Sequence, residues 1–143
     1  MIEPAAEKDY PELAEIWERS VRATHHFLEE DYLQLIKSLL IPVIFPAVEI
    51  YVYRNHNSAI AGFSGVAENK IEMLLIDPPY RGKGIGKKLT LFAIDHLHIS
   101  KVDVNEENEQ AIRFYLHMGF KITGRTELDP MGKPHPILQM ELT

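Results

Sequence analysis

Hydrophobic residues in the first part of the chain recur at the three- and four-residue spacing of helices. The first such stripe consists of Leu13, Ile16, Trp17 and Val21. It follows Asp9-Tyr-Pro-Glu12, which has the form of a capping box with Asp9 as the N-cap. We therefore predict a helix from Asp9 onward, with Trp17 in the hydrophobic core.

A second helical stripe follows the acidic residues 29–31, which favour a helix start. Its expected buried face consists of Tyr32, Leu35, Ile36 and Leu39. Pro42 is the expected end of this helix, because proline has no N–H group for the helical hydrogen bond.

The pattern from residue 48 to residue 76 predicts three successive strands. Residues 48–53 alternate and are rich in β-formers, residues 54–58 have turn chemistry, and residues 59–67 form the returning strand. Gly62 and Gly65 weaken that strand and indicate a bulge or a close packing contact. After a turn at residues 69–70, the apolar run 71–76 is expected to be a buried strand.

A glycine-rich turn links the 71–76 strand to a third predicted helix. Asp77-Pro78-Pro79 ends the strand, and glycines then alternate with other residues, several of them basic, in Arg81-Gly-Lys-Gly-Ile-Gly-Lys-Lys88. The helical stripe that follows consists of Ile85, Leu89, Phe92, Ala93 and Leu97. Unpaired N–H groups of a first helical turn, the positive end of the helix dipole and basic side chains together suit a phosphate or pyrophosphate.

Two common phosphate-binding patterns do not fit this turn. The P-loop pattern would place Arg81 at its first glycine and Lys88 at its hydroxyl position. The dinucleotide fingerprint fails because Lys87 and Leu89 stand where its third glycine is required.

The remaining chain predicts a strand, a helix and a final strand pair. Residues 101–104 form a short strand, parallel to the 71–76 strand through a right-handed crossover. Asn108 can cap a helix that Gly119 closes, and residues 120–125 and 137–142 are typical of an antiparallel pair. The expected fold class is therefore α/β: a single domain, residues 1–143, with a mixed, mostly antiparallel sheet flanked by helices.

Composition narrows the class of protein. With 143 residues, of which 45% are hydrophobic and 25% charged, the chain fits one globular domain. A net charge of −6 argues against a nucleic-acid binder. The absence of cysteine excludes disulfides, thiolate metal sites and a cysteine acyl-enzyme. Four histidines lie on predicted turns or helix faces without a paired ligand, namely His56, His96, His98 and His117, so we expect no metal site.

The N-terminal residues lack the basic-then-apolar order of a signal peptide. The most apolar run, residues 39–48, is broken by two prolines and is too short to span a bilayer. We therefore expect a cytoplasmic protein without membrane contact.

Two motifs resemble the GNAT N-acetyltransferase superfamily. Arg81-x-x-Gly84-x-Gly86, after a strand that ends in Asp-Pro, is similar to the acetyl-CoA loop of that superfamily. Residues 105–120 are similar to its second motif, an Asn-x-x-Ala segment followed by a tyrosine and a closing Gly-Phe. Thr24-His-x-Phe-Leu28 further resembles a branch of small bacterial GNAT proteins whose acceptor is generally unassigned. The resemblance spans the chain and implies a GNAT-like fold in which strands 71–76 and 101–104 splay apart.

The resemblance implies acetyl transfer from acetyl-CoA to a primary amine, without a metal. The residues that it assigns to the cofactor are Leu74, Ile76, Arg81, Gly82, Lys83, Gly84, Ile85, Gly86, Lys87, Asn105, Asn108 and Tyr115. A backbone N–H of the 74–76 segment would stabilise the oxyanion, and Tyr115 would protonate the CoA sulfur. Asn108 would contact the pantetheine arm, which is compatible with its role as a helix N-cap. Without the motif, Tyr115 would be interpreted as a core aromatic residue.

The acceptor side carries more than one candidate base. Glu72 is a carboxylate in an otherwise apolar strand, and it can accept the ammonium proton directly or through water, or simply attract the amine. His25 is the rival base, since histidine titrates near neutrality. The residues expected to contact the acceptor are Thr24, His25, Phe27 and Glu72.

Two classes of function follow. The first is an N-acetyltransferase, a monomer or homodimer, that acts on a small amine or a protein amine. The second is a catalytically idle module that binds acyl-CoA as a sensor or supports a partner. The presence of Tyr115 and Glu72 favours the enzyme, because a pure binding module needs neither.

Overall fold

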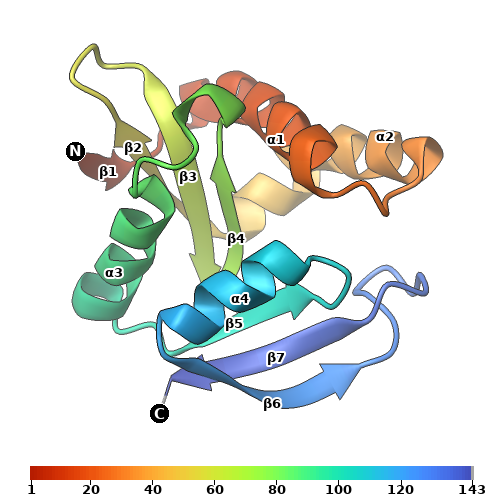
Figure 1. The fold of residues 1–143 in the computed structure, drawn as a ribbon. Helices are drawn as coiled ribbons and strands as arrows, with labels where there is room; N and C mark the ends of the chain where they lie inside the picture. Colours follow the sequence, from red (N-terminus) through yellow and green to blue (C-terminus); the bar gives the residue numbers. More distant parts are fainter. Residues whose placement is uncertain (143) are drawn as a thin grey trace.

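The computed structural model describes residues 1–142, and its centre is a seven-stranded sheet (Figure 1). The strand order is β1-β2-β3-β4-β5-β7-β6, in which β4 and β5 are parallel and the other neighbours are antiparallel. The strands are β1 Ile2–Pro4, β2 Glu49–Arg54, β3 Ile60–Ala67, β4 Lys70–Ile76, β5 Lys101–Asn105, β6 Phe120–Thr126 and β7 Ile137–Leu142. The predicted α/β class is confirmed, and β1 is a strand that the sequence pattern did not predict.

Four α-helices cover the two faces of this sheet. They are α1 Tyr10–Thr24, α2 Glu30–Leu39, α3 Ile85–Leu97 and α4 Glu109–His117, with shorter helical turns at η1 Glu7–Asp9, η2 Leu40–Ile44, η3 Phe45–Ala47 and η4 Pro78–Tyr80. Alternate residues of β2 point to opposite faces of the sheet. Ile50 and Val52 pack with α1 and α2 on one face, whereas Tyr51 contacts Phe92 of α3 on the other. None of the helices within residues 1–142 is long and apolar enough to cross a membrane.

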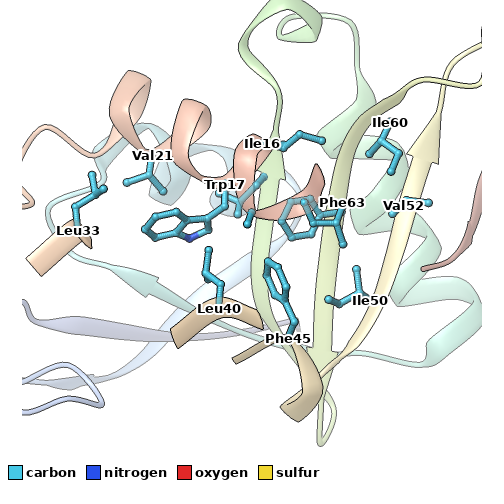
Figure 2. Close-up of a cluster of buried hydrophobic side chains, with 13 residues drawn as sticks. Ile16, Trp17, Val21, Leu33, Leu40, Phe45, Ile50, Val52, Ile60 and Phe63 are labelled. Carbon is cyan, nitrogen blue, oxygen red and sulfur yellow. The ribbon is translucent and has the colours of Figure 1, made fainter. Parts of the chain in front are cut away.

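The larger part of the core lies between α1, α2 and the first half of the sheet (Figure 2). Phe45 of η3 and Phe63 of β3 are fully buried and meet edge to face, with ring centroids 6.0 Å apart. Trp17 of α1 is buried in the same cluster, near Leu40, which confirms the prediction for this residue.

Three local predictions in the first helices are wrong. Asp9 does not cap α1: its carboxylate accepts a hydrogen bond from the Ala6 N–H (2.8 Å) and so stabilises the preceding turn η1. Leu35 is 43% exposed, whereas Leu33, which was not expected in the core, is 4% exposed. Pro42 does not end the helical conformation, because α2 passes into the π-helical turn η2 that contains it.

The glycines of β3 permit close packing against β4, as predicted. A Cβ atom on Gly62 would lie 2.9 Å from the Leu75 carbonyl oxygen, and one on Gly65 would lie 2.8 Å from the Met73 Cγ atom. The strand register also shifts after Gly65, so a bulge is present as well. The absence of side chains at these two positions therefore allows β4, the strand on which the candidate site is built, to lie close to β3.

The parallel pair β4–β5 separates soon after it begins. Its register consists of Lys70 opposite Lys101 and Ile71 opposite Val102, and β5 then pairs with β7 alone. Figure 1 shows the sheet dividing at this point, with β4 and β5 diverging. The predicted splay is confirmed, and it leaves one edge of the second half of β4 without a neighbouring strand.

Candidate active site

A cavity of about 320 Å³ lies where β4 and β5 diverge. Its walls come from the end of α1, the second half of β4, the glycine-rich turn with the start of α3, and α4. The predicted site residues that line it are Thr24, His25, Leu74, Ile76, Arg81, Gly82, Gly84, Ile85, Gly86, Lys87, Asn108 and Tyr115. The lining residues that the sequence did not reveal are Ser20, Leu75, Tyr80, Gln110, Ala111 and Phe114.

The open edge of β4 offers backbone hydrogen-bonding groups to this cavity. The Asp77 N–H donates to the Ala61 carbonyl of β3 (2.9 Å). Because backbone groups alternate in direction along an antiparallel strand, those of Leu74 and Ile76 point to the opposite edge, where β5 has already separated. Both residues also line the cavity, so a ligand with amide groups can bind there as an additional strand would.

The glycine-rich turn presents a run of free backbone donors. Within residues 1–142, no hydrogen-bond acceptor contacts the N–H groups of the six successive residues 82–87, and the first bond of α3 runs from Lys88 N–H to Gly84 O (3.0 Å). Gly84 has a φ of +79°, and a Cβ atom built there would have no neighbour within 4 Å. This cradle suits a multiply charged anion, because residues 85–87 form the first turn of α3 at its positive end and residues 82–84 add further free N–H groups beside it.

An ion pair between a half-exposed arginine and a nearly buried aspartate fixes the start of this turn. Asp77 follows β4 directly, and both of its carboxylate oxygens accept hydrogen bonds from the Arg19 guanidinium of α1 at 2.8 and 3.0 Å. The Asp77 carbonyl also accepts the Tyr80 N–H bond that forms η4 (2.9 Å). Such a paired, two-point contact gives a fixed geometry. Helix α1 and the anion cradle are therefore tied to each other.

Helix α4 and its N-cap residue form the opposite wall, and two of the polar side chains there are Asn108 and Tyr115. Asn108 caps the helix as predicted, since its Oδ1 atom accepts the Ala111 N–H (3.1 Å). Tyr115 is only 5% exposed, and its ring meets Phe114 and Phe120 edge to face. Burial raises the pKa of the Tyr115 phenol, so its hydroxyl group is protonated at neutral pH. It is a protonated donor on the wall of the cavity.

His25 closes the cavity at the end of α1 as a neutral imidazole. Burial, together with the positive charges of His26 and Arg81, lowers the pKa of His25 to about 4. Its ring nitrogens contact Thr24 Oγ1 at 2.7 Å and Asn108 Nδ2 at 3.4 Å. His25 thus lies against a residue predicted to bind the cofactor, rather than apart from it.

Comparison with known proteins identifies the family of this chain. The sequence profile of the acetyltransferase (GNAT) domain matches residues 46–122, which include the anion cradle, the open edge of β4 and α4. This chain belongs to the GNAT acetyltransferase family. It is 40% identical over 129 residues to the peptidyl-lysine N-acetyltransferase YjaB of Escherichia coli, which covers 90% of this chain and 87% of that protein. The GNAT assignment makes the protein an N-acetyltransferase that uses acetyl-CoA and an amine.

Solved structures agree with the GNAT fold. The solution structure of apo YjaB from Escherichia coli matches with a TM-score of 0.91 and 36% identity over 100% of this chain and 97% of that one. The PaiA N-acetyltransferase from Thermoplasma acidophilum, in complex with coenzyme A, matches with a TM-score of 0.74 and 21% identity over 100% and 98%. At that identity the second likeness concerns the fold alone.

Four residues predicted for the GNAT site do not line the cavity. The Lys83 ammonium lies over the Tyr80 ring (5.9 Å), and the Asn105 side chain accepts the Glu107 N–H in a turn (3.0 Å). The Phe27 ring packs against the His25 ring outside the cavity lining, with ring centroids 5.3 Å apart. Glu72 is exposed, close to the ion pair of Lys70 and Asp103. The cofactor role is therefore better supported for the rest of the turn than for Lys83 and Asn105.

Phe27, which was predicted to contact the acceptor, belongs to a cluster whose other contacts the sequence did not predict. His135 stacks on Tyr32, with centroids 5.6 Å apart and planes 6° apart, and its Nδ1 atom lies 2.8 Å from Glu107 Oε1. The Tyr32 hydroxyl donates to Asp129, and Phe27 packs beside His135. This cluster joins the loop after α1 to the loop between β6 and β7, next to the His25 end of the cavity.

Proposed function

We propose that this GNAT protein transfers the acetyl group of acetyl-CoA to the ε-amine of lysine residues in proteins. The observation that carries the proposal is the placement of the protonated Tyr115 hydroxyl in the same cavity as the free N–H groups of residues 82–87. The lysine specificity is supported by the similarity to YjaB, a peptidyl-lysine N-acetyltransferase. A net charge of −6 also favours approach of cationic lysine side chains.

The residues of the cavity fit three parts of acetyl-CoA: the pyrophosphate, the pantetheine arm and the thioester. The N–H groups of residues 82–87, with Arg81 and Lys87, would hold the pyrophosphate. The free backbone groups of Leu74 and Ile76, with Asn108, would bind the amides of the pantetheine arm. Acetyl-CoA supplies the thioester carbonyl, and a β4 backbone N–H would stabilise its developing oxyanion.

The reaction forms a C–N bond and breaks a C–S bond. The neutral amine of lysine attacks the thioester carbonyl carbon, the acetyl group moves to nitrogen, and the CoA thiolate leaves. One proton must be removed from the attacking nitrogen, and one must be given to the leaving sulfur. Tyr115 would give the second proton, since its phenol is protonated and lines the cavity.

Glu72 is the proposed base, acting through water, because His25 is poorly suited to this role. The pKa of His25 is lowered to about 4, and its Nε2 atom already faces Asn108. The pKa of Glu72 is raised, chiefly because the surrounding protein partly desolvates its carboxyl group although the residue as a whole is exposed. Asp103 and Glu68 raise this pKa further, and Lys70 opposes them. A raised pKa makes a carboxylate a stronger base at neutral pH.

Glu72→Gln is expected to lower kcat/KM by about 10-fold or more and to change its pH dependence. In the wild type both the lysine amine and Glu72 must be deprotonated, so a log plot of kcat/KM against pH steepens below the pKa of Glu72. The variant should keep the shallower slope of the amine alone. Glu7→Gln, at an exposed residue of η1, is the control. Identical profiles for Glu72→Gln and the wild type would remove Glu72 from the mechanism.

The acetylation itself is tested with acetyl-CoA and matched peptides. One peptide carries an internal lysine and a blocked N-terminus, a second has arginine in place of the lysine, and a third offers only its free N-terminal amine. We expect thiol release and a mass increase of one acetyl group with the first peptide. Acetyl-CoA binding without transfer to any amine would instead support an idle acyl-CoA sensor.

A further inference from the structure

A chain of hydrogen bonds fixes which nitrogen of His25 carries its proton. The Thr24 hydroxyl donates to the Ser20 carbonyl oxygen (2.8 Å). That bond uses the only hydrogen of the Thr24 hydroxyl group. In the contact between Thr24 Oγ1 and His25 Nδ1 (2.7 Å), the imidazole N–H must therefore donate to the hydroxyl oxygen. Nδ1 therefore carries the hydrogen, and Nε2 is a bare acceptor.

Asn108 completes the chain from the other side of the cavity. Its Oδ1 atom accepts the Ala111 N–H, which orients the side-chain amide so that Nδ2 faces His25. Nδ2 lies 3.4 Å from His25 Nε2, a long hydrogen bond in which the amide donates and the bare nitrogen accepts. Nδ2 has two hydrogens, and the second is left for a ligand in the cavity.

We infer that His25 is a positioning residue for the cofactor: it holds the Asn108 amide so that its second hydrogen points to the pantetheine arm of acetyl-CoA. The inference rests on the proposed function, because it places acetyl-CoA in this cavity. It differs from the sequence-based expectation, which assigned His25 to the acceptor. The amide is held at both ends, by Ala111 N–H and by His25, and neither contact uses the free hydrogen.

The charge state of His25 agrees with this role. Its lowered pKa keeps the ring neutral, and only the neutral ring has a bare Nε2 atom for Asn108. The cationic groups that disfavour protonation are His26 and Arg81, and Arg81 lines the same cavity. A second proton on His25 would place two donors, Nε2–H and the Asn108 amide, against each other.

The test compares two amides at position 25 that occupy different ends of the imidazole. In His25→Gln the side-chain amide reaches the place of Nε2 and can accept from Asn108, whereas in His25→Asn it reaches only the place of Nδ1. Calorimetric titration with acetyl-CoA should show a dissociation constant about five-fold higher for His25→Asn, and within about two-fold of wild type for His25→Gln. His26→Asn, at the exposed neighbouring histidine, is the control and should not change binding.

A double-mutant cycle separates positioning from direct contact. Asn108→Asp keeps the helix cap and removes the amide donor. In that background His25→Asn should cause no further loss of acetyl-CoA affinity, since His25 acts through Asn108. Additive losses, equal effects of the Asn and Gln variants, or an effect on the KM of the lysine peptide alone would each overturn the inference.

Nitrogen NMR of wild-type His25 gives a readout that needs neither a variant nor the cofactor. We expect a neutral ring with its hydrogen on Nδ1, and a ring protonated on Nε2 at neutral pH would contradict the inference. If the wild type acetylates the lysine peptide but the His25 variants bind normally, the proposed function stands and the inference is wrong. If the wild type does not bind acetyl-CoA, both are wrong.

Discussion

Replacement of Tyr115 by phenylalanine is expected to lower turnover about 100-fold, with little change in acetyl-CoA binding. The substitution removes one hydroxyl group and keeps the ring that packs against Phe114 and Phe120. Within residues 1–142 no hydrogen-bond partner holds that hydroxyl, and burial alone raises the pKa of the phenol. The fold therefore loses no hydrogen bond, and the melting temperature should stay the same or rise slightly. The expected loss lies in the chemical step.

The measurement is a single-turnover rate with acetyl-CoA and the lysine peptide, because product release can hide a slower chemical step. Tyr10→Phe is the matched control: Tyr10 packs against Phe45 in the core, away from the cavity, and its hydroxyl has no part in the proposal. A wild-type single-turnover rate for Tyr115→Phe would make Tyr115 a core aromatic residue. A general loss of folding would show in the melting curve.

The features that the sequence predicted well are those with local causes. The glycine-rich turn depends on consecutive residues: glycine permits the positive φ at position 84, the first helical N–H groups are free by geometry, and Asp-Pro-Pro ends the strand. The cap at Asn108 and the closing Gly119, with a φ of +103°, are equally local. The GNAT resemblance, which rests on such local motifs and on the Thr24–Leu28 segment, named twelve residues that line one cavity.

The features that the sequence missed depend on residues far apart in the chain. Arg19 and Asp77 are separated by 58 positions, and Tyr32 and Asp129 by 97. Neither pair has a local pattern, so the ion pair between α1 and the turn after β4 could not be found, nor could the contact between α2 and the loop between β6 and β7. The contact between His25 and Asn108 could not be found for the same reason, because only the fold brings the two residues together.

The choice of Leu35 in place of Leu33 on α2 has a different cause, whereas Tyr32 is buried and Ile36 packs against the core as predicted. A stripe through Leu35 and one through Leu33 both satisfy helical periodicity, and the choice depends on what packs against the helix. The core between α1, η2 and the sheet selects Leu33. Strand β1 was missed because three residues, Ile2–Pro4, are too few to show an alternating pattern, and their pairing with β2 defines them.

Replacement of Gly84 by valine is expected to weaken acetyl-CoA binding by about 100-fold. Gly84 has a φ of +79°, which a β-branched residue avoids, so the turn must rearrange although no neighbouring atom blocks the side chain. Rearrangement moves the N–H groups of residues 82–87 out of line with the pyrophosphate, and hydrogen bonds to charged groups contribute about 1.5–3 kcal/mol each. The loss of one or two of them accounts for the expected change in affinity.

Gly132→Val is the matched control for this prediction. Gly132 has the same φ of +79° and the same open surroundings, but it lies in the loop between β6 and β7. Both valine variants therefore place a β-branched residue at the same unfavourable φ, but only Gly84 belongs to the cradle. Acetyl-CoA binding of Gly132→Val should equal that of the wild type.

Thermal unfolding with acetyl-CoA distinguishes the two valine variants at one ligand concentration. At about 100 times the wild-type dissociation constant, mass action stabilises the wild type by about 2.7 kcal/mol, and a 100-fold weaker variant by only about 0.4 kcal/mol. For a domain of this size the first value corresponds to a rise in Tm of roughly 8 °C and the second to about 1 °C. Gly132→Val should show the full rise. If Gly84→Val shows it too, the pyrophosphate does not bind the N–H groups of residues 82–87, and the cradle has another role.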